Sequence, residues 1–359
     1  MTSTIGQDEV VDAARAPAPG AVASLVRNHW YVVAGVEEFD RTPKQRLILG
    51  EPVCFYSALD GSPVVLDDRC AHRRFPLSRS KLDGDTIVCG YHGFIYGNDG
   101  KCVRVPGGGN FRTIKVRSYP AVQRAPWVWI WTGDEPASAD PALIPWPEVA
   151  ERTDDQVTGY AMNPANYSMI HENLLDLPHF EFLHGVVAGF TESRPQLLSD
   201  ALLPVGFTDT AIGIRHGFDA EFGVWGVASD SDPTIKVSRT ETIISPTPAL
   251  CYGIGEFTPH DPTATALRTY AVLHCLTPAA ESRTHQFWTW WQDVTIAPGH
   301  EEWARFMSEL FKQDVDAVRW VHEYATADRR SGNVERSSAA DAAGLKMRRK
   351  LQELAAAEA

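Results

Sequence analysis

Residues 70–92 read CAHRRFPLSRSKLDGDTIVCGYH, and this stretch contains two short segments of the same kind. Cys70 and His72 stand in the first segment, and Cys89 and His92 stand in the second, after sixteen intervening residues. Thiolate and imidazole are ligands that soft and borderline metal ions prefer. Two loops that each provide one cysteine and one histidine therefore predict a four-ligand metal centre in the first third of the chain.

Two kinds of centre use this set of four side chains. A Rieske [2Fe–2S] cluster has two cysteines on one iron and two histidines on the other. A structural zinc site has all four around a single ion, and zinc fingers usually pair Cys with Cys and His with His along the chain. Here each loop has one of each, as it must if every loop is to reach both irons. The alternation favours the iron–sulfur cluster over zinc.

The charge and the cysteine content exclude several classes of protein. The 359 residues include 33 basic and 46 acidic ones, a net charge of −13, so we expect no nucleic-acid partner. No apolar run is long enough to span a membrane, and the start lacks the profile of a signal peptide. Six cysteines in a chain of this length do not indicate a disulfide framework. The sequence predicts a cytoplasmic protein.

Composition divides the chain into five segments. Residues 1–25 are rich in Ala and Pro and predict a flexible leader. Short apolar runs between turn residues predict a small antiparallel β domain over 26–135. Four prolines over 136–147 indicate a linker. A second domain is expected over 148–330, followed by a tail over 331–359 that is helical by propensity but weakly anchored.

The hydrophobic pattern predicts the elements of both domains. In the first domain we expect strands at 30–34, 46–49, 53–56, 64–66, 86–88, 93–96 and 127–131. In the second we expect a helix from 163 to about 184, strands at 213–218, 224–227, 235–244, 250–257, 269–276 and 285–291, and a helix from 300 to about 324. The apolar side of the last helix is expected to carry Trp303, Phe306, Leu310, Val315, Val318 and Val321.

A second metal motif lies in the expected helix around residue 180. His179 and His184 are five residues apart, and with a distant carboxylate they would form the 2-His-1-carboxylate triad of non-haem Fe(II) oxygenases. Five residues is not a regular helical repeat, so the helix must bend or end between the two histidines, and Pro178 offers a local cause. The pair alone is a weak signal, because a chain with 12 histidines can place two of them at this spacing without function.

Both motifs resemble those of the Rieske non-haem iron oxygenases. The first resemblance rests on CAHR at 70–73, CGYHG at 89–93 and the turn GNDG at 97–100. The second rests on the Asn-Asp-His-His order of Asn173, Asp176, His179 and His184. The resemblance implies an α+β fold. An N-terminal antiparallel β Rieske [2Fe–2S] domain would precede an α/β helix-grip (START-like) catalytic domain with a mononuclear iron.

The resemblance also implies roles for single residues. Asp314 matches the acidic ligand in the family's last long helix, with Asp316 as its near rival and Glu309 as a poorer third candidate. Asp176 would carry electrons from a Rieske histidine of a neighbouring subunit, His72 or His92, to His179. Such a link requires an oligomer, and the resemblance to vanillate and dicamba demethylases implies a homotrimer.

The implied function is that of a terminal oxygenase. It would use O2 and electrons from a separate NAD(P)H-dependent reductase, with or without a ferredoxin, to monooxygenate or demethylate a substituted aromatic. Ring dihydroxylation and amine oxidation are the alternatives within the family, and a pure electron carrier or a zinc-stabilised ligand-binding protein are those outside it. The residues that contact the substrate are harder to predict from the sequence. For each candidate, a role in core packing explains the residue equally well. The candidates are Trp288, Trp290, His274, His285 and Asn166.

Overall fold

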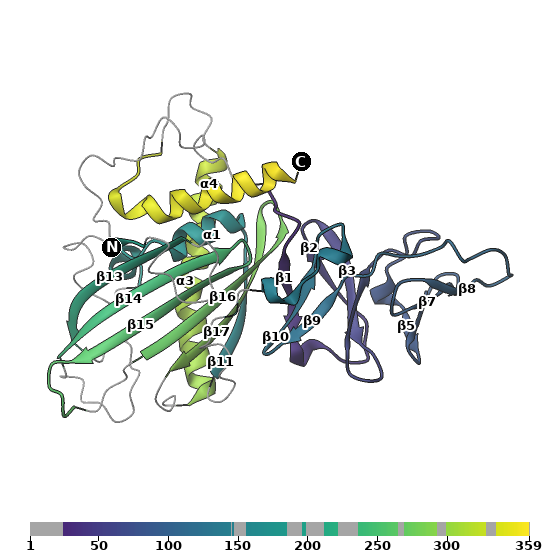
Figure 1. Cartoon of the computed structure of the whole chain (residues 1–359), viewed down its shortest axis with the longest axis horizontal. Coiled ribbons are helices and arrows are strands. Elements are labelled where there is room, and N and C mark those ends of the chain that lie inside the picture. Colours follow the sequence, from purple (N-terminus) through teal and green to yellow (C-terminus); the bar gives the residue numbers. More distant parts are fainter. Residues whose placement is uncertain are drawn as a thin grey trace. The chain divides into compact units, whose positions relative to one another are not determined.

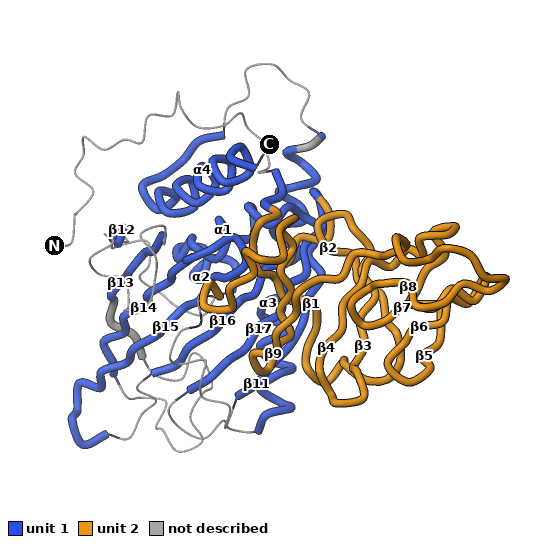
Figure 2. Tube along the Cα trace, turned by 45° about the vertical axis from the view of Figure 1, so that its right-hand side comes forward, with its two compact units in different colours: residues 1–26, 145–276, 281–359 blue, residues 27–144, 277–280 orange. Residues whose placement is uncertain are grey.

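The computed structural model describes residues 24–144, 146, 156–184, 196–198, 212–221, 236–264, 269–292, 299–327 and 335–358. The expected leader lies outside these residues up to position 23, as does the expected strand at 224–227. The chain forms two compact units (Figure 2). The N-terminal unit comprises residues 27–144 and 277–280, and the C-terminal unit comprises 1–26, 145–276 and 281–359.

The N-terminal unit is built from three small antiparallel sheets. Their strands, in sheet order, are β1 (Trp30–Gly35), β10 (Trp127–Trp131) and β9 (Ala121–Arg124); β2 (Lys44–Ile48), β3 (Glu51–Ser57) and β4 (Pro63–Asp67); and β5 (Lys81–Asp83), β6 (Thr86–Val88), β7 (Ile95–Gly97) and β8 (Cys102–Arg104). The expected strands are present, whereas β5, β8 and β9 were not foreseen, because strands of three or four residues carry little periodic signal.

The proline-rich segment after β10 belongs to this unit up to residue 144. Over those residues it is not a free linker. It forms two 3₁₀ turns, Pro136–Ser138 and Pro141–Leu143. Nε1 of Trp30 donates to the carbonyl oxygen of Asp140 at 2.9 Å, and Nη1 of Arg124 donates to that of Ile144 at 3.1 Å. Proline fixes φ in both turns, and these two side chains tie the segment to the β1–β10–β9 sheet.

The C-terminal unit is organised around one large sheet (Figure 1). Its seven described strands, in sheet order, are β11 (Gln156–Asn163), β17 (Arg283–Gln292), β16 (Thr269–Ala280), β15 (Leu250–Pro259), β14 (Lys236–Thr247), β13 (Ile212–Glu221) and β12 (Gln196–Leu197). The long helix α3 (His300–Ala327) packs against this sheet, and residues of both form one hydrophobic core.

The buried side of α3 differs in part from the expected one. Phe306 and Val321 are 40% and 58% exposed, whereas Met307 and Phe311 are buried. Along a helix of 28 residues, the apolar side drifts slowly around the helix axis. A prediction that counts spacings of three and four residues therefore assigns residues near the edge of that side wrongly.

The helix expected from residue 163 is two helices. Strand β11 continues to Asn163, and α1 (Tyr167–Leu174) begins after Asn166, whose side chain accepts a hydrogen bond from the Ser168 N–H at 3.0 Å. A short helix, α2 (His179–Phe182), follows Pro178. The helix therefore ends between the two histidines, as their spacing required.

The C-terminal segment is anchored more firmly than its composition suggested. Helix α4 (Ala342–Ala357), which follows a 3₁₀ turn at Ala339–Asp341, packs on α1 and buries Met347 and Leu351 in the core. Nε of Arg348 donates to Oε1 of Glu172 in α1 at 2.6 Å. The expectation of a weakly anchored tail is wrong for these residues. None of the described helices is long and apolar enough to cross a membrane.

Candidate metal centres

The two ligand loops of the N-terminal unit share one backbone pattern. In each, the cysteine N–H donates to the carbonyl oxygen five residues later, at 3.0 Å for Cys70 and 2.8 Å for Cys89. The cysteine carbonyl accepts from the N–H four residues later, at 2.8 and 3.0 Å. The residues at that fourth position, Arg74 and Gly93, both have left-handed backbones with φ of 55° and 69°. Two tight turns of the same shape thus place the ligands.

The sulfur atoms of the two loops are buried beside each other. Cys70 and Cys89 are 1% and 3% exposed, and all six cysteines of the chain are free thiols. The hydroxyl of Tyr96 accepts a hydrogen bond from the Ala71 N–H at 3.1 Å and lies 3.1 Å from Sγ of Cys70, so its proton can point to the sulfur. Burial raises the pKa of Cys89, while two backbone N–H groups of its loop bind the sulfur and lower it.

The imidazoles of the same loops lie on the outside. His72 and His92 are exposed, and their ring centroids are 4.6 Å apart. The His72 ring stacks on Phe94 with 4.7 Å between centroids. Two buried thiols that receive hydrogen bonds, facing two exposed imidazoles, fit a cluster with two sulfur and two nitrogen ligands.

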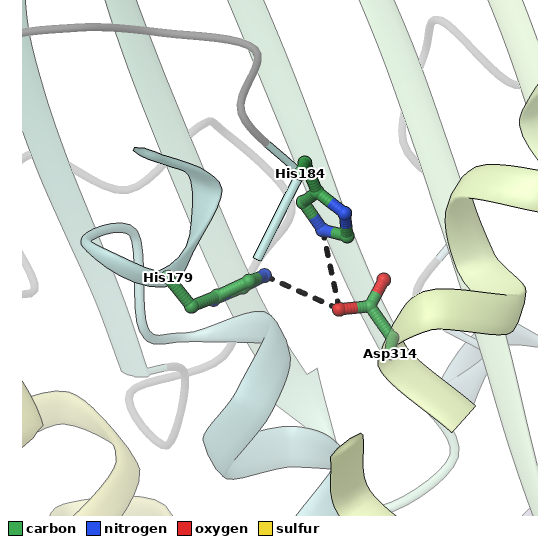
Figure 3. A group of neighbouring side chains, drawn as sticks. All are labelled: His179, His184 and Asp314. Atoms are coloured by element: carbon green, nitrogen blue, oxygen red, sulfur yellow. Dashed lines mark ion pairs between the residues drawn. The ribbon is translucent and has the colours of Figure 1, made fainter. Parts of the chain in front are cut away.

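The second group of ligands lies in the C-terminal unit. Nε2 of His179, at the start of α2, and Nε2 of His184, just after α2, each lie 3.3 Å from Oδ1 of Asp314 in α3 (Figure 3). The three ligand atoms are all within 4.8 Å of one another. Figure 3 shows the three side chains converging on one point from two different segments.

Hydrogen bonds on the far side of each ring leave the facing nitrogens free for a metal. Nδ1 of His179 donates to the backbone carbonyl of Asp176, and Nδ1 of His184 donates to Oε1 of Gln313 at 2.9 Å. A neutral imidazole that donates from Nδ1 has a lone pair on Nε2. Two such lone pairs and a carboxylate at one point repel each other unless a cation lies between them. The residues therefore fit a mononuclear metal.

The carboxylate of the group is held by a third residue. Nδ2 of Asn173 donates to Oδ1 of Asp314 at 3.2 Å. Burial would raise the pKa of Asp314, but protons on Nε2 of His179 and His184 outweigh it and hold that pKa well below its usual range. A metal cation in place of these protons would act in the same direction. Asp314 is therefore an anion at neutral pH, as a metal ligand must be.

The rival carboxylates lie elsewhere on α3. Asp316 forms an ion pair with Arg319 at 2.9 Å, and Glu309 is an exposed partner of Lys312 at 3.9 Å. Asp314 and Asp316 are two residues apart and so point to opposite sides of the helix. The structure brings Asp314, and neither of the other two, to the histidines.

The contact between Asp176 and His179 is made by the backbone of Asp176. Its backbone carbonyl oxygen, and not its carboxylate, accepts the hydrogen bond from His179. Burial raises the pKa of the carboxylate, although the nearby His179 lowers it.

The role of Gln313 as the partner of His184 was not predicted from the sequence. The only sequence feature that indicated it was its position directly before Asp314.

The His-His-Asp group opens on a cavity with about 540 Å³ of empty space, part of it open to solvent. Most of its walls are apolar and come from α1, α3 and the strands β14 to β16. They include Leu174, Ile243, Val272, Met307, Leu310 and Phe311. Trp290 and His274 line this cavity, as foreseen, but Trp288 does not, His285 instead contacts Tyr160, and Asn166 caps α1.

The orientation of His274 is fixed from behind the cavity. Oε1 of Gln286 accepts a hydrogen bond from Asn163 at 2.8 Å, so its Nε2 amide group donates to Nδ1 of His274 at 2.9 Å. Burial lowers the pKa of His274 to about 4, which keeps the ring neutral. A neutral ring that accepts at Nδ1 has its proton on Nε2, so His274 is a hydrogen-bond donor.

Comparison with known proteins agrees with both centres. Residues 29–120 match the Rieske [2Fe–2S] domain, and residues 164–357 match the vanillate O-demethylase oxygenase C-terminal domain. The oxygenase component of dicamba O-demethylase from Stenotrophomonas maltophilia is 32% identical over 277 residues, covering 74% of this chain and 77% of that protein. A vanillate O-demethylase oxygenase subunit from a Pseudomonas species is 33% identical over 167 residues, 45% of this chain and 47% of its own length.

The fold agrees as well. The crystal structure of dicamba monooxygenase bound to dicamba superposes with a TM-score of 0.80 at 27% identity and covers 94% of this chain and 99% of that one. The chain belongs to the Rieske non-haem iron oxygenases. Within them it is a terminal oxygenase subunit related to the vanillate and dicamba O-demethylases. The predicted family, fold class and Rieske cluster are confirmed, and the His-His-Asp group is consistent with the mononuclear iron.

Proposed function

We propose that this protein oxidises a substituted aromatic compound with O2, by monooxygenation or oxidative demethylation. The observation that carries the proposal is the His-His-Asp group at the end of an apolar cavity. In the proposal, Cys70, His72, Cys89 and His92 hold the [2Fe–2S] cluster, and His179, His184 and Asp314 hold a mononuclear iron. Bound Fe(II) with open coordination positions would supply the activation of dioxygen.

The chain's own residues bind and orient the substrate. The apolar walls, with Phe311 and Trp290, suit a planar ring and exclude water from the reacting carbon. His274 offers one donor, at Nε2, to a polar substituent. The indole of Trp290 stacks on Tyr270 with 4.3 Å between centroids, and this contact holds the ring in place in the wall.

Electrons are proposed to come from a separate NAD(P)H-dependent reductase, with or without a ferredoxin, through the exposed His72 and His92 edge. From there we propose that they reach the mononuclear site of a neighbouring subunit through Asp176, within a homotrimer. The position of Asp176 supports this, since its carbonyl is hydrogen-bonded to His179. The free thiols support a cytoplasmic setting, where cysteines stay reduced.

The first test measures both centres and the reaction on one preparation. Iron and sulfide are quantified, and the EPR spectrum of the dithionite-reduced protein is recorded. We expect about three irons per chain and a Rieske-type signal. With a ferredoxin and reductase from a related system, a methoxylated aromatic should yield formaldehyde. A Rieske signal with no oxygen consumption on any of a panel of methoxylated and methylated aromatics would contradict the proposed function.

A further inference from the structure

The lining of the cavity includes polar residues besides the His-His-Asp group and His274. Glu241 of β14 and Tyr270 of β16 both line it, although Glu241 is only 2% exposed. Nε and Nη2 of Arg239 donate to Oε2 of Glu241 at 3.1 and 2.7 Å. The Tyr270 hydroxyl lies 2.8 and 2.6 Å from the two oxygens of Glu241 and accepts from Nη2 of Arg239. We call these three residues the polar triad.

Strand register places the triad at one level of the sheet. Glu241 pairs with Gly255, and Gly255 pairs with Tyr270. A Cβ on Gly255 would lie 2.1 Å from the Tyr270 ring, so only glycine lets the ring cross β15 and reach Glu241. His274 lies four residues from Tyr270 on β16, which is about 13 Å along the strand. The charge of Asp314 acts on the pKa of His274, so His274 lies towards the His-His-Asp group and the triad lies towards the other end of the cavity.

Arg239 stands behind the carboxylate and does not line the cavity. Its guanidinium packs over the rings of Phe257 and Tyr270, 5.1 and 5.5 Å from their centroids, and it is 1% exposed. A substrate in the cavity thus meets Glu241 and the phenol before it could meet the arginine. An anion cannot use this arginine as its counter-ion.

The triad presents acceptors to the cavity. The phenol has one proton, and its pKa is raised by burial and by Glu241 well above 10, so it stays protonated and donates that proton to Glu241. Oε2 of Glu241 already accepts two hydrogen bonds from Arg239, and the single proton of Tyr270 is shared between Oε2 and Oε1, so Oε1 has no donor other than Tyr270 among the described residues. A carboxylate oxygen can accept two hydrogen bonds. Glu241 and Gly253 both line the cavity, and a Cβ on Gly253 would be in ordinary contact with Oε1 at 3.5 Å, so this oxygen lies beside the cavity wall at Gly253.

We propose that Glu241 selects substrates that carry an N–H or O–H donor at the end remote from the iron, and rejects carboxylates and sulfonates there. The inference rests on the proposed function of the cavity and adds the class of substrate. An N–H or O–H group on the substrate gives Oε1 its second hydrogen bond. Because the apolar walls exclude water, leaving that bond unmade costs free energy. A second anion beside Glu241 would be repelled at short range in a low dielectric.

The test uses three probes that share the 4-methoxyphenyl group and differ at the other end: 4-methoxybenzamide, the nearly isosteric 4-methoxybenzoate, and methyl 4-methoxybenzoate, which is larger by one methyl group. Dissociation constants are measured with the full-length protein by calorimetry and by quenching of tryptophan fluorescence. We expect the amide to bind at least about tenfold tighter than either the benzoate or the ester, which is about 1.4 kcal/mol. Replacing the amide by 4-methoxybenzylamine then distinguishes a neutral donor from a cationic one.

Variants separate recognition from packing. Glu241→Gln keeps the shape of the side chain and removes its charge, so the repulsion of the benzoate is lost and the preference for the amide should fall at least tenfold. Glu256→Gln, on the exposed side of β15, is the matched control and should keep the wild-type preference. A wild-type protein that binds the benzoate as well as the amide overturns the proposal, and so does an unchanged preference in Glu241→Gln.

Formaldehyde release from the same probes is followed in parallel, because it tests a different claim. Tight amide binding without formaldehyde would contradict the proposed demethylation while leaving the role of Glu241 intact. Formaldehyde formed preferentially from the benzoate would support the reaction and overturn the inference about Glu241.

Discussion

Gln313 accepts a hydrogen bond from Nδ1 of His184 at 2.9 Å, while the next residue, Asp314, lies 3.3 Å from Nε2 of the same ring. Neighbouring helical residues point about 100° apart, so this part of α3 contacts the imidazole on two sides. One side fixes the tautomer, and the other provides the carboxylate. The precision of the site at His184 thus depends on α3 more than on the short helix α2.

The first prediction concerns Gln313. Gln313→Leu removes the acceptor for Nδ1 of His184, and the affinity of the second centre for Fe(II) should fall about 10–100-fold, as is typical for the loss of such a partner. Competition with a chelator, followed by iron analysis, measures the change. Gln352→Leu in α4 is the control and should behave like wild type. Equal iron retention in both variants would show that the tautomer is set in another way.

The second prediction separates the two aspartates of α3. Asp314→Ala removes a ligand and should leave about two irons per chain with an intact Rieske signal. Asp316→Ala breaks only a partly exposed pair with Arg319 and should retain about three irons and change stability by less than about 1 kcal/mol. The reverse pattern of iron content would move the assignment to Asp316.

The third prediction concerns electron transfer. Asp176→Asn keeps the backbone carbonyl that orients His179, so both centres should remain occupied, while product formation should fall by about two orders of magnitude or more. Single-turnover measurements with a pre-reduced cluster and excess substrate identify the slow step. Turnover at the wild-type rate would rule out a role for the carboxylate in the link.

The fourth prediction uses the left-handed residues of the two ligand loops. Gly93→Ala forces a side chain into φ of 69° and within 3.2 Å of Pro106, and should destabilise the N-terminal unit by about 1–2 kcal/mol. Arg74→Gly at the equivalent position relieves the same conformation and should leave stability unchanged or increase it. Loss of the cluster's visible circular dichroism on heating compares the two. A lower midpoint for Arg74→Gly would mean that the arginine side chain stabilises its loop.

The fifth prediction concerns pH. His171 is fully buried between Ser245 and the Pro248 carbonyl, and burial lowers its pKa to about 4. A histidine that stays neutral when folded but charges at about 6.5 when unfolded stabilises the fold above that pH. The free energy of unfolding should therefore decline as the pH falls from about 6.5 towards 4, by up to a few kcal/mol. In His171→Gln the decline should be smaller. It should not disappear, because the pKa of His274 is also lowered by burial and this residue is still present. Identical pH profiles for the two proteins would contradict this.

The sequence was sufficient for features that are local. The cluster loops, the paired histidines and the break near Pro178 each follow from residues close together in the chain. The choice of Asp314 depended on which side of α3 faces the core, and periodicity placed Phe306 and Val321 on the wrong side. Contacts between distant segments could not be foreseen.

The polar triad is the clearest example of such a contact. Arg239, Glu241 and Tyr270 meet only because Gly255 on the strand between them has no side chain. Single residues of these types on separate strands have no sequence signature. The packing of α4 on α1 was missed for the same reason, because Arg348 and Glu172 are 176 residues apart in the chain.

The firm attachment of α4 bears on how the enzyme can be handled. The helix covers α1, and α1 ends in the turn that contains Asn173, the residue that holds Asp314. Proteolytic clipping before residue 342, or a fusion partner that unwinds the helix, would remove Met347 and Leu351 from the core and so loosen the iron site from behind.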